Sequence, residues 1–245
     1  MRDWDPEEYK RLVERTKDPH LREIMRREKF HIKECVSGSK ARTFIEAGAG
    51  TGRLVPFLSR LAYEVVAVEI NDKMVEELEK RARPYKNVTV IHGDVIELDK
   101  LLDKHGIEPR FPVVLSMFNT LGTAEGDPYE MLNGMKRVAE KEGEMIITLF
   151  CRYSLEDWGT KMYGKIKSLV GEPDLSRCDF KKGIFKTKES YSSKWWSLEE
   201  MADIFTRLET EVTIEWINPY FYILHSDYDY AKQKLMELGY KGLKA

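Results

Sequence analysis

The sequence has few of the features that mark secreted, membrane-bound or metal-dependent proteins. Its three cysteines, Cys35, Cys151 and Cys178, are widely spaced and form no metal-ligand pattern, so we expect reduced thiols and no metal site. No stretch approaches the roughly 20 apolar residues that span a bilayer, and the first residues contain no apolar signal core. We therefore expect a cytoplasmic protein without a membrane partner.

An excess of either charge is also missing. The 40 Lys and Arg residues nearly balance the 42 Asp and Glu residues, which gives a formal net charge of −2. No field of the whole chain attracts nucleic acid or anionic lipid, so any such preference depends on a local patch. Hydrophobic residues make up 42% of the 245 positions, enough for the core of one α/β domain with an insertion.

The order of patterns predicts a helical cap followed by alternating strands and helices. Residues 1–40 are charged and have apolar residues at helical spacing, so we expect helices outside the sheet. In 41–150, β-branched runs alternate with helical patterns, which predicts a parallel sheet covered on both faces. The strands are expected at 43–45, 64–68, 87–91, 111–117 and 143–150.

The alternation stops after Phe150 and resumes near Ser197. Residues 151–195 are too long for an ordinary loop, and we expect an inserted cap over the substrate. Residues 196–245 then complete the core with a helix, two strands at 211–217 and 220–226, and a C-terminal helix. The short Asn218-Pro219 connection predicts an antiparallel hairpin at the sheet edge. The fold class is therefore α/β, with a seven-stranded, mostly parallel Rossmann-like sheet.

A glycine-rich turn follows the first expected strand. It reads Glu46-Ala47-Gly48-Ala49-Gly50-Thr51-Gly52, at the position where open α/β sheets bind ligands. The dinucleotide fingerprint expects its third glycine where Arg53 stands, and a P-loop requires Gly-Lys followed by Ser or Thr. The turn therefore favours neither a nicotinamide cofactor nor a nucleoside triphosphate.

Acidic residues end the first three expected strands. The pattern E-x-G-x-G-x-G, then Glu69, then Gly93-Asp94, resembles the class I S-adenosylmethionine-dependent methyltransferases over about residues 42–150. The resemblance implies that Glu69 holds the ribose hydroxyls, that Asp94 faces the adenine amino group and that Glu46 faces the methionine ammonium. The implied cofactor contacts are Glu46, Gly48, Ala49, Gly50, Gly52, Glu69, Ile70, Asp94, Val95, Met117 and Phe118.

Each acidic residue also has a structural interpretation. Glu69 can be a solvated strand end, Asp94 a helix N-cap and Glu46 a surface charge. Three carboxylates at the carboxyl ends of successive strands favour the binding interpretation, because these ends line one crevice.

The segment after the fourth strand is also informative. Residues 116–122, Ser-Met-Phe-Asn-Thr-Leu-Gly, resemble the loop of small-molecule N-methyltransferases that lies between cofactor and acceptor. Asn119 either orients the acceptor or forms the turn that asparagine favours. The fourth strand begins Phe111-Pro112, where the family often has an aromatic residue followed by Asp, so that strand boundary is less certain.

The insertion combines basic and aromatic residues, ten basic against six acidic. Its aromatic rings pack as a cap on the sheet, or line an acceptor pocket that includes Tyr153 and Trp195, or stack on single-stranded nucleic acid. The balanced net charge and the lack of an Asn-Pro-Pro-Tyr type motif disfavour nucleic acid.

These observations predict an enzyme that transfers a methyl group in line from S-adenosylmethionine to a small-molecule amine or hydroxyl, leaving S-adenosylhomocysteine. The alternatives are an RNA or protein methyltransferase and a non-catalytic module that binds the cofactor. Neither a catalytic base nor the oligomeric state follows from the sequence.

Overall fold

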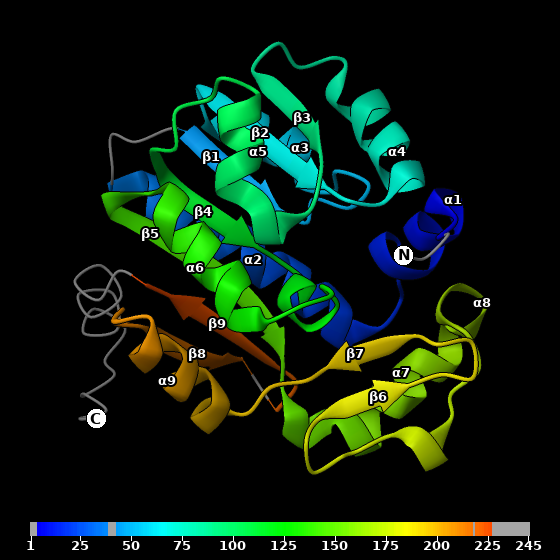
Figure 1. The fold of residues 1–245 in the computed structure, drawn as a ribbon. Coiled ribbons are helices and arrows are strands. Elements are labelled where there is room, and N and C mark those ends of the chain that lie inside the picture. The colour runs from blue at the N-terminus through cyan, green and yellow to red at the C-terminus, as the bar shows by residue number, and fades with distance from the viewer. Residues whose placement is uncertain (1–3, 39–42, 218, 227–245) are drawn as a thin grey trace.

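The computed structural model describes residues 4–38, 43–217 and 219–226. The expected C-terminal helix and Asn218 of the hairpin turn lie outside them. Figure 1 shows one central sheet with helices on both faces, and the segment 151–195 beside the carboxyl ends of the strands.

The central sheet has seven strands in the order β3-β2-β1-β4-β5-β9-β8. Neighbouring strands among the first five are parallel, whereas β9 pairs antiparallel with both β5 and β8. This arrangement confirms the predicted fold class and its edge hairpin. The strands are β1 (Thr43–Ala47), β2 (Glu64–Glu69), β3 (Val88–His92), β4 (Phe111–Ser116), β5 (Ala139–Phe150), β8 (Thr213–Ile217) and β9 (Phe221–His225).

Apolar layers cover both faces of the sheet, so its strands are buried on both sides. On one face lie α2 (Pro19–Gly38), α3 (Val55–Leu61) and α4 (Asp72–Ala82). On the other lie α5 (Leu98–Lys104), α6 (Pro128–Val138) and α9 (Leu198–Arg207). Alternate residues of β2 show the division, since Val65 packs in the first layer and Val66 in the second.

Residues 151–195 form a compact subdomain of short elements. They are η4 (Arg152–Ser154), η5 (Leu155–Gly159), α7 (Thr160–Lys165), α8 (Lys167–Val170), η6 (Leu175–Arg177), β6 (Ile184–Lys186) and β7 (Ser192–Lys194). The β6–β7 pair is a two-stranded sheet that the sequence patterns did not indicate. Ser197 and Glu200 form a capping box that begins α9, so the main fold resumes near Ser197, as expected.

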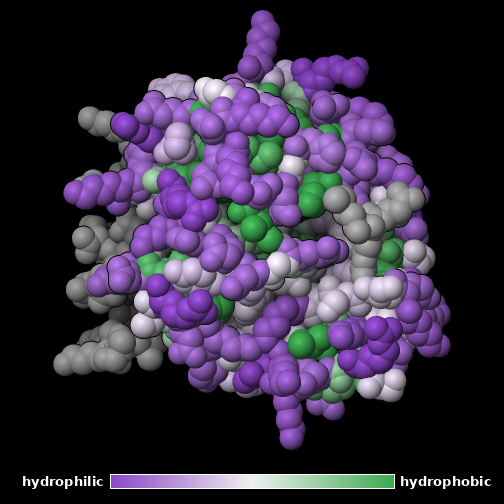
Figure 2. Space-filling view, viewed as in Figure 1, coloured by the Kyte–Doolittle hydropathy of each residue, from purple (hydrophilic) through white to green (hydrophobic). Residues whose placement is uncertain are grey.

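The N-terminal segment comprises α1 (Pro6–Tyr9), the π-helical turn η1 (Lys10–Glu14) and α2. In Figure 1, α1 lies beside α4, near the carboxyl ends of the parallel strands. Hydrophilic residues dominate the face drawn in Figure 2. Within the described residues, no helix is long and apolar enough to cross a membrane.

Candidate functional site

The glycine loop, residues 46–52, leads from the end of β1 toward α3, beside the β1–β4 boundary where the strand order reverses. Gly48, Gly50 and Gly52 all have positive φ, at 81°, 57° and 77°. A Cβ on Gly48 or Gly52 would collide with a side chain, whereas a Cβ on Gly50 would meet no atom within 4 Å. Gly50 therefore exposes its backbone to open space, as a ligand site at this position requires.

Glu69 at the end of β2 points toward the glycine loop. Its side chain accepts hydrogen bonds from the backbone N–H of Gly50 at 2.7 Å and of Asn71 at 3.0 Å. Glu69 is only 9% exposed, so it is not a solvated strand end. Each carboxylate oxygen keeps a second lone pair for a ligand hydroxyl.

Asp94 follows β3 and is the N-cap of η2 (Val95–Glu97). Its Oδ1 accepts from the N–H of Ile96 at 3.0 Å, so the capping interpretation describes an observed contact. The backbone holds this segment close to β2, because the Gly93 N–H donates to the Glu69 carbonyl at 2.9 Å. Capping uses one acceptor site of Asp94, and the carboxylate has others.

Glu46 is buried at the end of β1, with 3% of its surface exposed. Its Oε2 has no hydrogen-bond partner among the described residues. Burial raises the pKa of Glu46 to about 8, opposed by Arg53 and assisted by Glu28 and Glu69. Glu46 is therefore not a surface charge, and an arriving cation would find an acceptor there.

Glu28 of α2 is a site residue that the sequence analysis missed. It is fully buried, and its Oε2 accepts from Arg53 Nη2 at 2.6 Å. Its Oε1 accepts from the Phe118 N–H at 2.9 Å and from Thr148 Oγ1 at 2.7 Å. These contacts, the Glu28 cluster, join α2 to the glycine loop, to the loop after β4 and to β5. Its partners are 25, 90 and 120 residues away, so no local pattern indicates it.

The loop after β4 is held in an unusual backbone conformation. Phe118 and Asn119 have positive φ, at 53° and 63°, which non-glycine residues adopt mainly where the surroundings enforce it. The Asn119 side chain accepts from the Phe150 N–H at 3.2 Å and donates to the Lys194 carbonyl at 3.1 Å. Its amide thus joins the loop to the subdomain, which favours the turn interpretation over an acceptor contact.

Tyr153 and Trp195, the two aromatic residues predicted to contact the acceptor, lie in other surroundings. Trp195 is fully buried, and its Nε1 donates to the Tyr163 hydroxyl at 3.1 Å. Tyr153 is 54% exposed, and its ring lies 6.5 Å from that of Trp216 on β8. In the described part of the chain, neither shares a polar or ring contact with the glycine loop. Burial of Trp195 in the aromatic core leaves no face for a ligand in this conformation.

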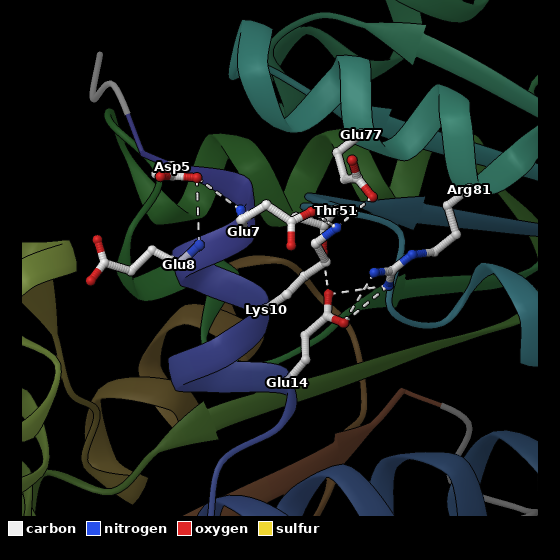
Figure 3. A network of polar contacts seen from close by, with 8 residues as sticks. All are labelled: Asp5, Glu7, Glu8, Lys10, Glu14, Thr51, Glu77 and Arg81. Carbon is white, nitrogen blue, oxygen red and sulfur yellow. Dashed lines mark hydrogen bonds and ion pairs between the residues drawn. The ribbon is translucent and has the colours of Figure 1, made fainter.

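The N-terminal segment lies against the glycine loop, as Figure 3 shows. Glu14 accepts from the Arg81 guanidinium of α4 at 3.1 Å and from the Thr51 hydroxyl. Lys10 Nζ lies 2.8 Å from Glu77 Oε1. Residues 6–14 therefore bridge the glycine loop and α4.

Tyr9 adds a hydroxyl to this region. Its pKa is raised, first by burial, and Arg53, Glu14, Glu69 and Glu28 all act on it electrostatically. The hydroxyl thus stays protonated and can donate a hydrogen bond near the loop. No group of metal-ligating side chains occurs in the described residues.

Comparisons with known proteins agree with this geometry. The family model described as "Methyltransferase domain" matches residues 38–206. The ribosomal RNA small subunit methyltransferase A of Syntrophus aciditrophicus is 44% identical over 59 residues, which are 24% of this chain and 21% of that protein. The chain thus aligns with about a fifth of the length of such curated relatives.

Solved structures are similar over most of the chain. A SAM-dependent methyltransferase from Aquifex aeolicus superposes with a TM-score of 0.56 at 17% identity, covering 91% of this chain and 98% of its own. The 1,6-didemethyltoxoflavin-N1-methyltransferase of Burkholderia thailandensis, solved with S-adenosylhomocysteine, has a TM-score of 0.59 at 15% identity, covering 90% and 85%. At these identities the likeness shows the fold. Because the family model spans more than half of the sequence, the chain belongs to the class I S-adenosylmethionine-dependent methyltransferases.

Proposed function

We propose that this methyltransferase acts on a small molecule with an amine or hydroxyl, held between its N-terminal segment and the loop after β4. The observation that carries the proposal is the Glu28 cluster, in which a buried carboxylate of α2 contacts both loops at once. Together with the Glu14 contacts to Thr51 and Arg81, it places N-terminal residues against the site. That arrangement suits an enclosed small acceptor better than a long polymer.

The residues at the carboxyl ends of the strands fit the cofactor on two observations. Open space faces Gly50 where a side chain would stand, and Glu46 has a buried oxygen without a partner. We infer that Glu69 binds the ribose hydroxyls, Asp94 the adenine amino group and Glu46 the ammonium. The remaining proposed contacts are Gly48, Ala49, Gly52, Ile70, Val95, Met117 and Phe118.

The cofactor supplies a methyl group on a sulfonium, which an in-line nucleophile displaces. The protein's contribution is to position the acceptor near 3 Å from the methyl carbon and to exclude water. We infer that Tyr9 and the Glu28 cluster orient the acceptor, because they border the loop from the side of α1 and α2. We do not assign Asn119, Tyr153 and Trp195 to the acceptor site, because their side chains form hydrogen bonds with other parts of the protein.

A ribosomal RNA acceptor is the second candidate, favoured by the similarity to the RNA methyltransferases. That similarity covers a quarter of the chain. Stacking on single strands needs exposed rings beside basic residues, yet of the tyrosine and tryptophan residues between 151 and 196 only Tyr153 is exposed and the other five are buried. They are Trp158, Tyr163, Tyr191, Trp195 and Trp196.

Transfer of a labelled methyl group separates the two candidates. Purified protein is incubated with methyl-labelled S-adenosylmethionine and cell extract, and metabolites, RNA and protein are then separated. We expect label among the metabolites, and much less there with the Gly50→Ala variant at a low concentration of the cofactor. Label confined to RNA would overturn the small-molecule proposal, and the absence of label in every fraction would favour a binding-only module.

A further inference from the structure

The indole of Trp4 has a buried hydrogen-bond donor without a partner. Its Nε1 forms no hydrogen bond within the part of the chain that the structure describes, although a buried indole N–H usually finds an acceptor. The ring itself is half-buried and packs against the apolar cluster of the first sheet face. An indole N–H only donates, so a molecule that satisfies it must carry an acceptor atom.

Trp4 lies between the glycine-loop region and the subdomain 151–195. Its ring stacks on Tyr9, with the ring centres 5.7 Å apart and the planes at 21°. It also contacts the Tyr191 ring of the subdomain, at 6.0 Å between centres, and Figure 1 shows α1 between α4 and this subdomain. Tyr9 in turn interacts electrostatically with Arg53, which directly follows the glycine loop. The unsatisfied N–H therefore belongs to the region in which the proposed acceptor is held.

The loop after β4 adds another half-buried ring to this region. Phe118 contacts Phe150 edge to face, with the ring centres 5.6 Å apart. The Arg53 guanidinium carbon lies 5.4 Å from the centre of the Phe118 ring, and Arg53 also acts on Tyr9. Arg53 thus lies near aromatic rings of both chain segments. Aromatic walls favour a planar ligand, because flat groups stack on them over a large area.

Charged side chains around these rings form ion pairs with one another. The pairs are Lys10 with Glu77, Arg81 with Glu14 and Arg53 with Glu28. Opposite charges at contact distance largely cancel at the position of a third group, so such pairs attract an ionic ligand weakly. The carboxylates of Glu46 and Glu69 have the proposed cofactor contacts instead. We therefore expect ring contact and hydrogen bonding, rather than net charge, to select the acceptor.

We propose that Trp4 determines acceptor specificity by donating its indole N–H to an uncharged, planar acceptor that lies against Tyr9 and Phe118. The class of acceptor is then a phenol, an aromatic amine or a nitrogen heterocycle, whose own oxygen or nitrogen receives the methyl group. Trp4 binds and orients this ring and takes no part in the transfer. The inference rests on the proposed function, a small acceptor held between the N-terminal segment and the loop after β4.

The chemical identity of the methylated product tests the class. The protein is incubated with methyl-labelled S-adenosylmethionine and the metabolite fraction of cell extract, and the labelled product is purified and identified by mass spectrometry. We expect the label on the oxygen or nitrogen of an aromatic compound. A labelled aliphatic product, such as an amino acid or a polyamine, would overturn this inference and leave the proposed function standing. Absence of label from the metabolites would overturn the proposed function, and this inference with it.

Trp4→Phe tests the hydrogen bond, because it removes the N–H and keeps a ring against Tyr9. With the metabolite fraction diluted in series, the variant should need about three- to tenfold more of it for half-maximal rate, the contribution of one neutral hydrogen bond. The rate at saturation and the affinity for S-adenosylhomocysteine should stay unchanged. Trp158→Phe is the matched control, since Trp158 Nε1 is also buried without a hydrogen bond among the described residues. Its ring neighbours are His20, Phe150, Trp195, Tyr220 and Phe221.

The remaining outcomes all count against the role of Trp4. If Trp4→Phe needs no more of the metabolite fraction than the unmodified protein, its N–H does not bind the acceptor. If Trp4→Phe and Trp158→Phe need equally more, the loss comes from altered packing rather than from a hydrogen bond. A fall in the affinity of Trp4→Phe for S-adenosylhomocysteine, measured by titration calorimetry, would place the indole at the cofactor instead.

Discussion

Helix α2 contributes to two polar clusters that differ in which of their atoms lack hydrogen bonds. The Glu28 cluster faces the glycine loop, where Arg53 Nη1 and Glu46 Oε2 have no hydrogen-bond partners in the part of the chain that the structure describes. Three residues further along, His31 enters a second group, the edge cluster, at the far side of the sheet. Its members are Arg27, His31, Glu144, Glu215 and His225.

The edge cluster forms a continuous series of contacts. His31 Nδ1 lies 2.9 Å from His225 Nε2, and His225 Nδ1 contacts the Glu144 carboxylate. On its other side, His31 Nε2 lies 3.1 Å from Glu215 Oε2, and Glu215 also pairs with Arg27. The series joins α2 to β5, β8 and β9, and every member has a charged or hydrogen-bonding neighbour.

The difference between the two clusters indicates which of them lies at a ligand site. In the edge cluster His31 Nε2 has no hydrogen bond among the described residues but lies beside the Glu215 carboxylate, whereas the unsatisfied atoms at the glycine loop belong to one carboxylate and one guanidinium, which a ligand can complete. Glu28 and His31, three residues apart in α2, thus connect this helix to two different regions, the glycine loop and the edge hairpin.

The largest loss of unfolding free energy is expected from Glu28→Gln. Removing one partner of a buried ion pair leaves Arg53 charged and uncompensated, which costs about 3–5 kcal/mol. Urea unfolding of the free protein measures it. Glu23→Gln on the same helix, which breaks an exposed pair with Arg26, is the control and should cost under about 1 kcal/mol. Similar losses of unfolding free energy in both variants would show that the Glu28 cluster contributes no more stability than an exposed ion pair.

The fold was largely predictable because its signals are local. β-branched runs such as Val65–Val68 and caps such as Asn71 and Ser197 mark where strands end and helices begin. The β6–β7 pair escaped prediction, since each strand has only three residues. Strand β5 begins at Ala139, earlier than expected, where its register against β4 shifts between Phe111 and Val113.

The candidate site was predictable only where it follows the strand ends. Glu46 and Glu69 are buried at the ends of β1 and β2, where the motif places them, and Glu69 contacts the glycine loop; their contacts with the cofactor stay predictions. Glu28 could not be predicted, because its partners are brought together only by folding. The positions of the aromatic residues of the insertion could not be predicted for a different reason. Their sequence spacing is the same whether they line a pocket or fill a core, and Trp195 is in the core.

The second-largest effect is expected from substituting Gly50. Its control distinguishes the loss of space for the cofactor from backbone strain at a positive φ. Gly50→Ala introduces a Cβ into the open space at the loop, which should weaken cofactor binding by about 2 kcal/mol, or roughly thirtyfold. Gly106→Ala is the matched control, since Gly106 has φ of 67° and its Cβ would also meet no atom within 4 Å. Both variants should lose stability alike, and only the first should lose affinity. Equal affinities measured by titration calorimetry would place the cofactor elsewhere.

The edge cluster should respond to pH rather than to the cofactor. Burial lowers the pKa of His31 to about 3, assisted by His225 and Arg27. The unfolded chain takes up the proton near pH 6.5 and the folded chain does not, so this contribution is complete above pH 6.5 and is lost as pH falls toward 3. Between pH 7 and pH 4.5 we expect His31→Asn to lose less stability than the unmodified protein, by roughly 1–2 kcal/mol.

Urea midpoints at the two pH values measure this difference, with exposed His105→Asn as the control. Identical pH dependence of all three proteins would mean that His31 takes up its proton in the folded state. Loss of cofactor affinity in His31→Asn at pH 7 would contradict the separation of the edge cluster from the cofactor site.

The smallest effect concerns the contacts drawn in Figure 3. Glu14→Gln keeps an acceptor for the Thr51 hydroxyl but removes the charge that pairs with Arg81. For a partly exposed pair this costs about 0.5–1 kcal/mol, so S-adenosylhomocysteine should dissociate about two- to fivefold faster. Because Glu14 bridges the glycine loop and α4, the change should appear in the dissociation rate more than in unfolding. Glu8→Gln breaks a pair with Arg11 that touches neither element, and a matching acceleration there would show that residues 6–14 do not retain the cofactor.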